Sequence, residues 1–62
     1  MEMKVRAQVF CDGTLIAEFE WPDHASKFAW GMSDHNDSTY SVVTEHQSSV
    51  FHKGRLIERT RN

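Results

Sequence analysis

The segment Met3–Trp21 constrains the fold of this chain more than any other. Apolar and polar residues largely alternate on both sides of Asp12-Gly13, which is the pattern of two antiparallel strands joined by a tight turn. If Cys11–Gly13 forms a three-residue loop with a G1 bulge, apolar side chains meet across the strands on one face. These pairs are Val9/Leu15, Ala7/Ala17, Val5/Phe19 and Met3/Trp21.

The charges on the other face of this hairpin favour the same register. Arg6 then lies opposite Glu18 and Lys4 opposite Glu20, which places opposite charges directly across the strands. A two-residue turn would slip the register and set Arg6 against Phe19. Because a slip of one residue reverses a whole face, we predict the three-residue loop.

A helix is predicted after the hairpin. Pro22 cannot continue the strand ladder, and Asp23 is a good N-cap residue, so the helix begins there and runs to about Asp34. Trp30 lies about 200° around the helix from Phe28, on the polar side, so we expect it to be exposed. The apolar face of the helix is formed by Ala25, Phe28, Ala29 and Met32.

The second half of the chain predicts further strands. Residues 39–46 are rich in β-branched and aromatic residues, and residues 49–52 follow a plausible turn. Residues 55–59 form a short fifth strand if Lys53-Gly54 is a turn rather than a bulge, and residues 59–62 are expected to fray. The pattern predicts no internal repeat. The predicted fold is a single α+β domain of two layers, in the order β-β-α-β-β. One helix packs on one face of an antiparallel sheet of four or five strands.

The predicted register divides the apolar residues between two faces of the sheet. The helix is expected to cover Met3, Val5, Val9, Leu15, Phe19, Tyr40 and Val42. The opposite face has no second helix to cover it, as is common in antiparallel sheets. The apolar residues expected on that open face are Phe10, Ile16, Val43 and Val50.

The order of a strand-Gly-strand hairpin, an Ala-rich aromatic helix and a Tyr-x-Val strand resembles that of many short bacterial and phage proteins. The resemblance is one of architecture over most of the chain. It identifies no family and transfers no functional residue.

Length and charge narrow the classes of function. A chain of 62 residues makes one domain and buries only roughly 60% of its unfolded surface, so self-association would add stability. The N-terminus lacks the order of a signal peptide, no apolar run is long enough for a membrane helix, and Cys11 is the only cysteine. We therefore expect a cytoplasmic protein. Residues 12–45 carry a net charge of −6, whereas residues 53–62 carry +3.

The residues that could support chemistry form no known pattern. His24, His35, His46 and His52 have neither the helical spacing nor the cysteine partners of a metal site. Cys11 and the serines near His46 lack a Gly-rich elbow and a third orienting residue. We therefore predict no enzyme, no metal and no cofactor.

The sequence favours a non-catalytic protein-interaction domain of an accessory or regulatory kind, for which a homodimer is one expected form. The predicted interface residues are Phe10, Ile16, Trp30, Val43 and Val50. For Trp30 an alternative is packing against the 35–38 loop or the C-terminal segment of the same chain. The alternative function is nucleic-acid binding by the basic C-terminal segment, through Lys53, Arg55, Arg59 and Arg61.

Overall fold

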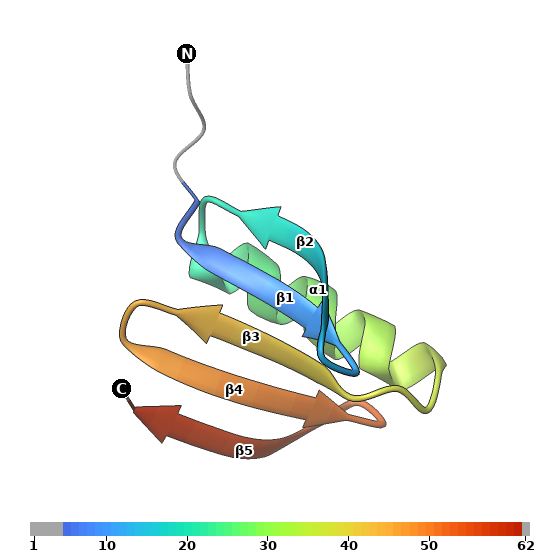
Figure 1. Cartoon of the computed structure of the whole chain (residues 1–62). Helices are drawn as coiled ribbons and strands as arrows, with labels where there is room; N and C mark the ends of the chain where they lie inside the picture. The colour runs from blue at the N-terminus through green and yellow to red at the C-terminus, as the bar shows by residue number, and fades with distance from the viewer. Residues whose placement is uncertain (1–4, 62) are drawn as a thin grey trace.

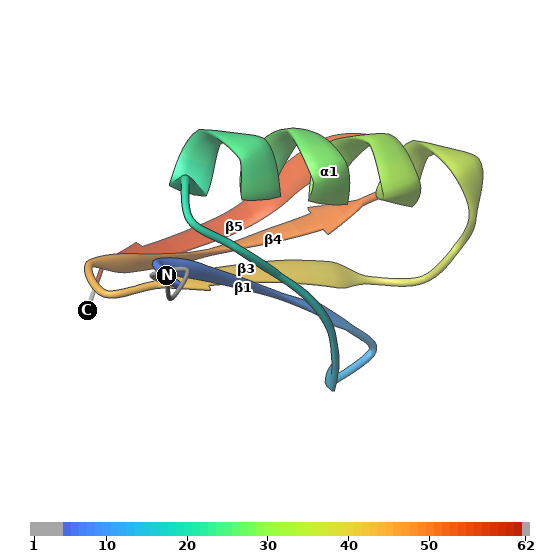
Figure 2. The ribbon, with the colours of Figure 1, turned by 90° about the horizontal axis from the view of Figure 1, so that it is seen from above.

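The computed structural model describes residues 5–61, which form an α+β domain of two layers (Figures 1 and 2). Its elements are β1 (Ala7–Cys11), β2 (Thr14–Phe19), α1 (Pro22–His35), β3 (Tyr40–Thr44), β4 (Gln47–His52) and β5 (Arg55–Arg61). The five strands form one antiparallel sheet in the order β2-β1-β3-β4-β5. This confirms the predicted fold class, with the larger of the two strand counts.

The core lies between α1 and one face of the sheet. Figure 2 shows the helix on one side of the strands, and no second layer of residues 5–61 on the other side. Ala25 and Ala29 are fully buried, and their small side chains let the helix backbone approach the sheet closely. The buried apolar residues are Ala7, Val9, Ala25, Ala29, Tyr40, Val42 and Phe51.

The helix begins two residues earlier than predicted. Pro22 is its first residue and Trp21, with extended backbone, is its N-cap. Proline suits this first position because it has no N–H to satisfy and its φ is already helical. The prediction of Asp23 as N-cap is therefore wrong. Asp23 lies in the first turn, where its negative charge interacts favourably with the positive end of the helix dipole. Ser33, rather than the predicted Met32, completes the buried face.

The first hairpin has a different register from the predicted one. Asp12 and Gly13 have φ angles of 50° and 88°, and two successive positive values are typical of a two-residue type I′ turn. A bulge follows, because the chain passes from the pair Phe10/Leu15 to the pair Val9/Ala17 and leaves Ile16 between them.

Together the turn and the bulge shift the predicted pairing by two residues. Ala7 now lies opposite Phe19, and Gln8 rather than Arg6 lies opposite Glu18. A shift of two preserves the faces, so Val9 and Ala7 still point to the helix as expected. The predicted pairs Met3/Trp21 and Lys4/Glu20 lie outside the described residues.

Two residues expected under the helix are exposed instead. Leu15 comes before the bulge and pairs with Phe10, so it shares the face of Phe10 and is 45% exposed. Val5 precedes β1 and is 42% exposed. Both expectations were wrong because they assumed a regular ladder along the whole hairpin.

The second hairpin, β4–β5, repeats the construction of the first. Lys53 and Gly54 have φ angles of 52° and 75°, again a type I′ turn, and a bulge leaves Ile57 between two paired residues. The two segments, residues 9–16 and 50–57, read VFCDGTLI and VFHKGRLI and share five of eight residues. The prediction of no internal repeat is therefore wrong.

The two hairpins present opposite faces to the helix. β1 and β4 both run antiparallel to β3, and their partners β2 and β5 lie at the two outer edges. A half turn about an axis along β3 therefore relates the hairpins and exchanges the faces. Val9 is buried under the helix while the matching Val50 lies on the open face; Phe51 is buried while the matching Phe10 lies on the open face.

The last strand is longer than predicted. Gln47 and Ser48 continue the β4 ladder and pair with Arg61 and Thr60, so the segment expected to fray is held by strand pairing up to Arg61. Asn62 lies outside the described residues. Residues 5–61 contain no helix long and apolar enough to cross a membrane.

The two turn glycines give a matched test of this structure. A Cβ at Gly13 would meet no atom within 4 Å, whereas a Cβ at Gly54 would lie 2.7 Å from Asp34 Oδ1 and 3.3 Å from its Cβ. Gly13→Ala should cost about 1–2 kcal/mol, the strain of a left-handed residue. Gly54→Ala should lower the free energy of unfolding by more, because the Asp34 carboxylate must also turn away and its Cβ must shift by a few tenths of an ångström. Urea denaturation measures both variants. Asp34→Ala should recover part of the excess, and equal costs at both glycines would contradict the packing described.

Candidate functional site

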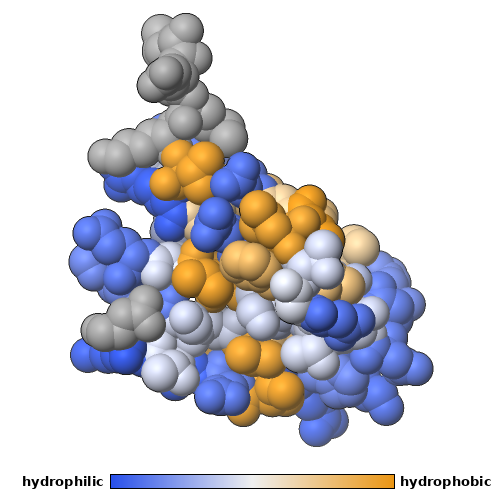
Figure 3. Space-filling model, in the orientation of Figure 1, coloured by the Kyte–Doolittle hydropathy of each residue, from blue (hydrophilic) through white to orange (hydrophobic). Residues whose placement is uncertain are grey.

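The open face of the sheet carries an apolar centre. Phe10, Val43 and Val50 are half-buried there, on three adjacent strands, as the sequence predicts. Figure 3 shows hydrophobic residues along the middle of this face, with hydrophilic residues on both sides. Ile16, the fourth residue expected there, lies at the β2 bulge and is 43% exposed.

The strand register arranges the side chains of this face in two rows that cross the sheet, each with apolar and polar residues. One row runs across the sheet as Leu15, Phe10, Ser41, Val50 and Glu58. The next runs as Glu18, Gln8, Val43, Ser48 and Thr60. Three of the six middle positions of these rows are apolar, and the charged Glu18 and Glu58 lie at row ends. Apolar residues flanked by polar ones are usual in protein-binding surfaces.

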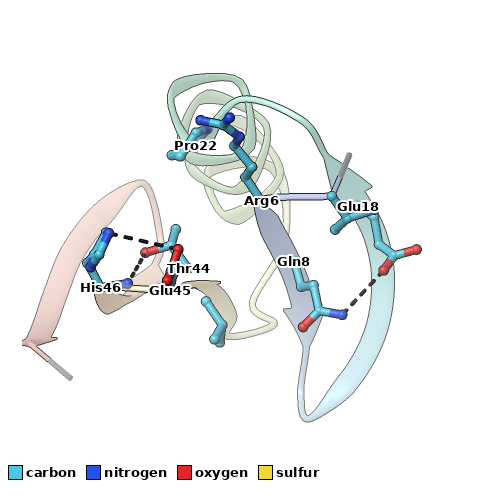
Figure 4. A pocket seen from close by; sticks show the side chains of 9 residues that line it. Arg6, Gln8, Glu18, Pro22, Thr44, Glu45 and His46 are labelled. Carbon is cyan, nitrogen blue, oxygen red and sulfur yellow. Dashed lines mark hydrogen bonds and ion pairs between the residues drawn. The ribbon is translucent and has the colours of Figure 1, made fainter. Parts of the chain in front are cut away.

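A shallow hollow of about 710 Å³ adjoins this face at the end where β1 and β3 stop pairing (Figure 4). Gln8 Nε2 donates to Glu18 Oε2 at 3.3 Å on one wall. Thr44 Oγ1 shapes the opposite wall, because it accepts from the backbone N–H of His46 and of Gln47 and so closes the β3–β4 turn. The lining residues are Val5, Arg6, Gln8, Glu18, Pro22, Val43, Thr44, Glu45 and His46.

The hollow extends the open face rather than forming an enclosed pocket. Gln8, Glu18 and Val43 belong to both, and the Glu45 and His46 side chains are almost fully exposed. Arg6 lies 5.7 Å from the centre of the Trp21 ring, a cation–π distance that holds the guanidinium at the rim. The sequence did not predict this hollow, because it arises where two strands part and no residue pattern marks that point.

Trp30 is exposed, as predicted, but also has partners within the chain. It is 54% exposed, yet its Nε1 donates to the carbonyl oxygen of Gly54 and its ring lies 6.0 Å from that of Phe51. The buried Ser33 Oγ accepts from the N–H of Gly54 at 3.1 Å and donates to the Trp30 carbonyl at 2.8 Å. Both backbone groups of Gly54 are therefore bonded to α1. This is the alternative in which Trp30 packs against the C-terminal segment of the same chain.

The four basic residues near the C-terminus lie along β5 and its turn. Every residue of β5 is exposed. Arg55 lies opposite His52, whereas Arg59 lies opposite the buried Ser49, so these two arginines are on opposite faces of the sheet. Arg61 shares the face of Arg59 because it is two residues further along the strand.

The residues considered for chemistry are not brought together. Among residues 5–61, no three His, Cys, Asp or Glu side chains gather in a way that could hold a metal. Cys11 is a free, half-buried thiol that packs against the core at the end of β1.

Comparisons with known proteins identify no relative: no family model, no curated protein and no solved structure matches this chain.

The contact between Trp30 and Gly54 can be tested by substitution. Trp30→Phe keeps an aromatic ring against Phe51 but removes the indole N–H, and should lower the free energy of unfolding by about 0.5–1.5 kcal/mol. Trp21→Phe is the control, because Trp21 is similarly exposed and its ring contacts Arg6 at the surface, a contact that phenylalanine can keep. Urea denaturation followed by circular dichroism measures both. An equal cost at the two tryptophans would count against the bond to Gly54.

Proposed function

We propose that this chain is a small, non-catalytic protein-interaction domain, of the accessory kind found in bacteria and phages, which binds through the open face of its sheet. The observation that carries the proposal is the apolar centre formed by Phe10, Val43 and Val50. It lies on the face that no second layer of residues 5–61 covers. A cytoplasmic setting suits a domain whose one cysteine is unpaired.

A second copy of the chain is the simplest occupant of this face. An isologous contact places each apolar patch on its own copy, and so needs no further partner. Five strands spaced about 4.8 Å apart and about 17 Å long give roughly 400 Å² per copy, or about 800 Å² in total. Stable interfaces bury about 1,200–2,000 Å², so this dimer is a weak one that forms at high concentration.

The charges on the open face favour one orientation of the two copies. Arg55 lies at the end next to the β4–β5 turn, whereas Glu18 and Glu45 lie toward the other end, where they outnumber Arg6. A two-fold axis that runs across the strands turns one copy end for end, so its basic end approaches the acidic end of the other. An axis along the strands would bring the two basic ends together, which like-charge repulsion disfavours.

Substitution at the centre of the open face tests the proposal. Val43→Glu should shift the dimer to monomer, because two buried carboxylates would lie near the symmetry axis without partners. Met32→Glu is the matched control, since it adds the same charge on the helix side. Sedimentation equilibrium at rising concentration, up to hundreds of micromolar, measures the mass. Phe10→Thr, which adds no charge and suits a strand, provides a second variant if Val43→Glu unfolds.

A strictly monomeric mass for the unchanged chain would overturn self-association through this face. Equal dimerisation of Val43→Glu and Met32→Glu would place the contact elsewhere. Circular dichroism confirms for each variant that the helix is retained.

Nucleic-acid binding is less well supported than protein binding. Arg55 lies on one face of β5 and Arg59 and Arg61 on the other, so they do not form one stripe along which phosphates could bind. Trp30, a possible stacking residue, is already engaged with Gly54 and Phe51.

We therefore expect no mobility shift with single-stranded or double-stranded DNA or RNA at tens of micromolar protein and low salt. A shift that weakens steeply with salt, and less steeply after Arg59→Gln, would favour the nucleic-acid alternative.

A further inference from the structure

We propose that the outer edge of β5 binds an extended, acidic segment of a partner protein by strand addition. This surface is distinct from the open face, and the inference goes beyond the proposed function. Within residues 5–61, β5 is the last strand of the sheet and pairs with β4 alone, so no described strand bonds to the backbone groups on its other side. An added strand would bond to those groups and continue the sheet.

The charge of β5 selects the chemistry of the partner. Arg55, Arg59 and Arg61 outweigh Glu58 on a strand whose seven residues are all exposed, and Lys53 adds a fourth cation at the turn. The rest of the chain is acidic, with a net charge of −6 over residues 12–45. Carboxylates of a partner are therefore attracted to this edge and repelled elsewhere.

The distribution of the arginines over two faces suits a strand rather than a phosphate backbone. Arg55 lies on the open face, and Arg59 and Arg61 lie on the helix side. The side chains of an added strand also alternate between the two faces, so carboxylates at alternate positions can meet Arg59 and Arg61 directly across the ladder. A nucleic-acid backbone that lies on one face would reach only part of this set.

The exposed apolar residues of β5 give the partner a second kind of contact. Leu56 is 41% exposed and Ile57 is 58% exposed, and they precede the regular stretch 58–61. The bulge at Ile57 interrupts the ladder, so the added strand pairs with residues 58–61 and places an apolar side chain near Leu56 or Ile57.

A second copy of β5 does not fit the same edge. Two β5 strands related by a two-fold axis run antiparallel with their helices on one side. The two-fold axis can pass through the middle of β5 at residue 58, 59 or 60. Glu58 then faces Glu58 of the other copy, Arg59 faces Arg59, or Arg59 faces Arg61, respectively. Like charges placed directly opposite are destabilising, which leaves a partner with carboxylates as the favoured occupant.

A synthetic peptide tests the inference. The probe is a ten-residue, fluorescein-labelled peptide with Glu at alternate positions, Thr between them and Val at the end that meets Leu56. Fluorescence anisotropy at low salt measures its affinity. Arg59→Glu should weaken binding at least tenfold, because it replaces attraction by repulsion next to the ladder. Lys27→Glu makes the same change of charge on the helix and should alter the affinity less than twofold.

The same peptide with alternate backbone nitrogens methylated separates strand addition from simple charge attraction. Methylation on the edge that faces β5 should abolish binding, whereas methylation on the far edge should leave it unchanged. Equal affinity of the two methylated peptides, equal affinity of Arg59→Glu and Lys27→Glu, or no binding of the unmodified peptide would each overturn the inference. Tighter binding of a single-stranded DNA of matching charge would do so as well. Because Val43→Glu leaves β5 unchanged, peptide binding by that variant separates this inference from the proposed function.

Discussion

The attachment of the β4–β5 turn to the helix determines how the rest of this domain is arranged. Gly54 has a positive φ and sits against Asp34, and its N–H and carbonyl groups are bonded to Ser33 and Trp30. Without this contact β5 would be held to the domain through its ladder with β4, since every one of its residues is exposed. The bonds also fix the C-terminal half of α1 over β4, where Trp30 covers Phe51.

The single helix breaks the symmetry that the repeated hairpins would otherwise give the sheet. The hairpins share a turn type, a bulge and five of eight residues, and the half turn that relates them exchanges the two faces. The repeated Val-Phe pair of each hairpin therefore offers one apolar side chain to each face. The helix covers Val9 and Phe51 and leaves Phe10 and Val50 outside. The apolar character of the open face thus follows from the same repeat that supplies the core.

The sequence was sufficient for the fold class because alternation and helical periodicity are local signals. It also placed Phe10, Val43 and Val50 on one face, since that requires only the parity of each strand. It failed on the pairing partners of Arg6 and Glu18. The two-residue turn and the bulge at Ile16 each move the pairing by one residue, and the total shift of two leaves the side chains beyond the bulge on their predicted faces. The position of Ile16 at a bulge carries no local signal, and only the comparison with Ile57 reveals that the irregularity is built in twice.

The remaining surprises concern contacts between residues distant in sequence. Trp30 reads as a free anchor on the polar side of a helix, and its bond to Gly54 depends on how the second hairpin curls toward that helix (Figure 2). In the same way, residues 59–61 read as a frayed tail until pairing with β4 is known. In both cases tertiary contact decides between two readings that the local sequence leaves open.

The two proposed surfaces meet along β5, and this has a physical consequence. Glu58 and Thr60 belong to the open face, and Arg55 lies at its basic end, while the backbone of the same strand forms the free edge. A strand added to this edge would widen the open face from five strands to six, and so increase its area by about a fifth at the usual strand spacing. Because the estimated dimer interface is small, such an increase would matter. The partner's carboxylates lie on the helix side, across from Arg59 and Arg61, but their negative charge would still offset part of the positive charge at the basic end that orients the two copies. The larger open face would make binding of the partner and dimerisation favour each other, whereas the weaker charge at the basic end would oppose this. Salt screens the charge effect more than it weakens apolar contact. The balance therefore moves toward cooperation as ionic strength rises.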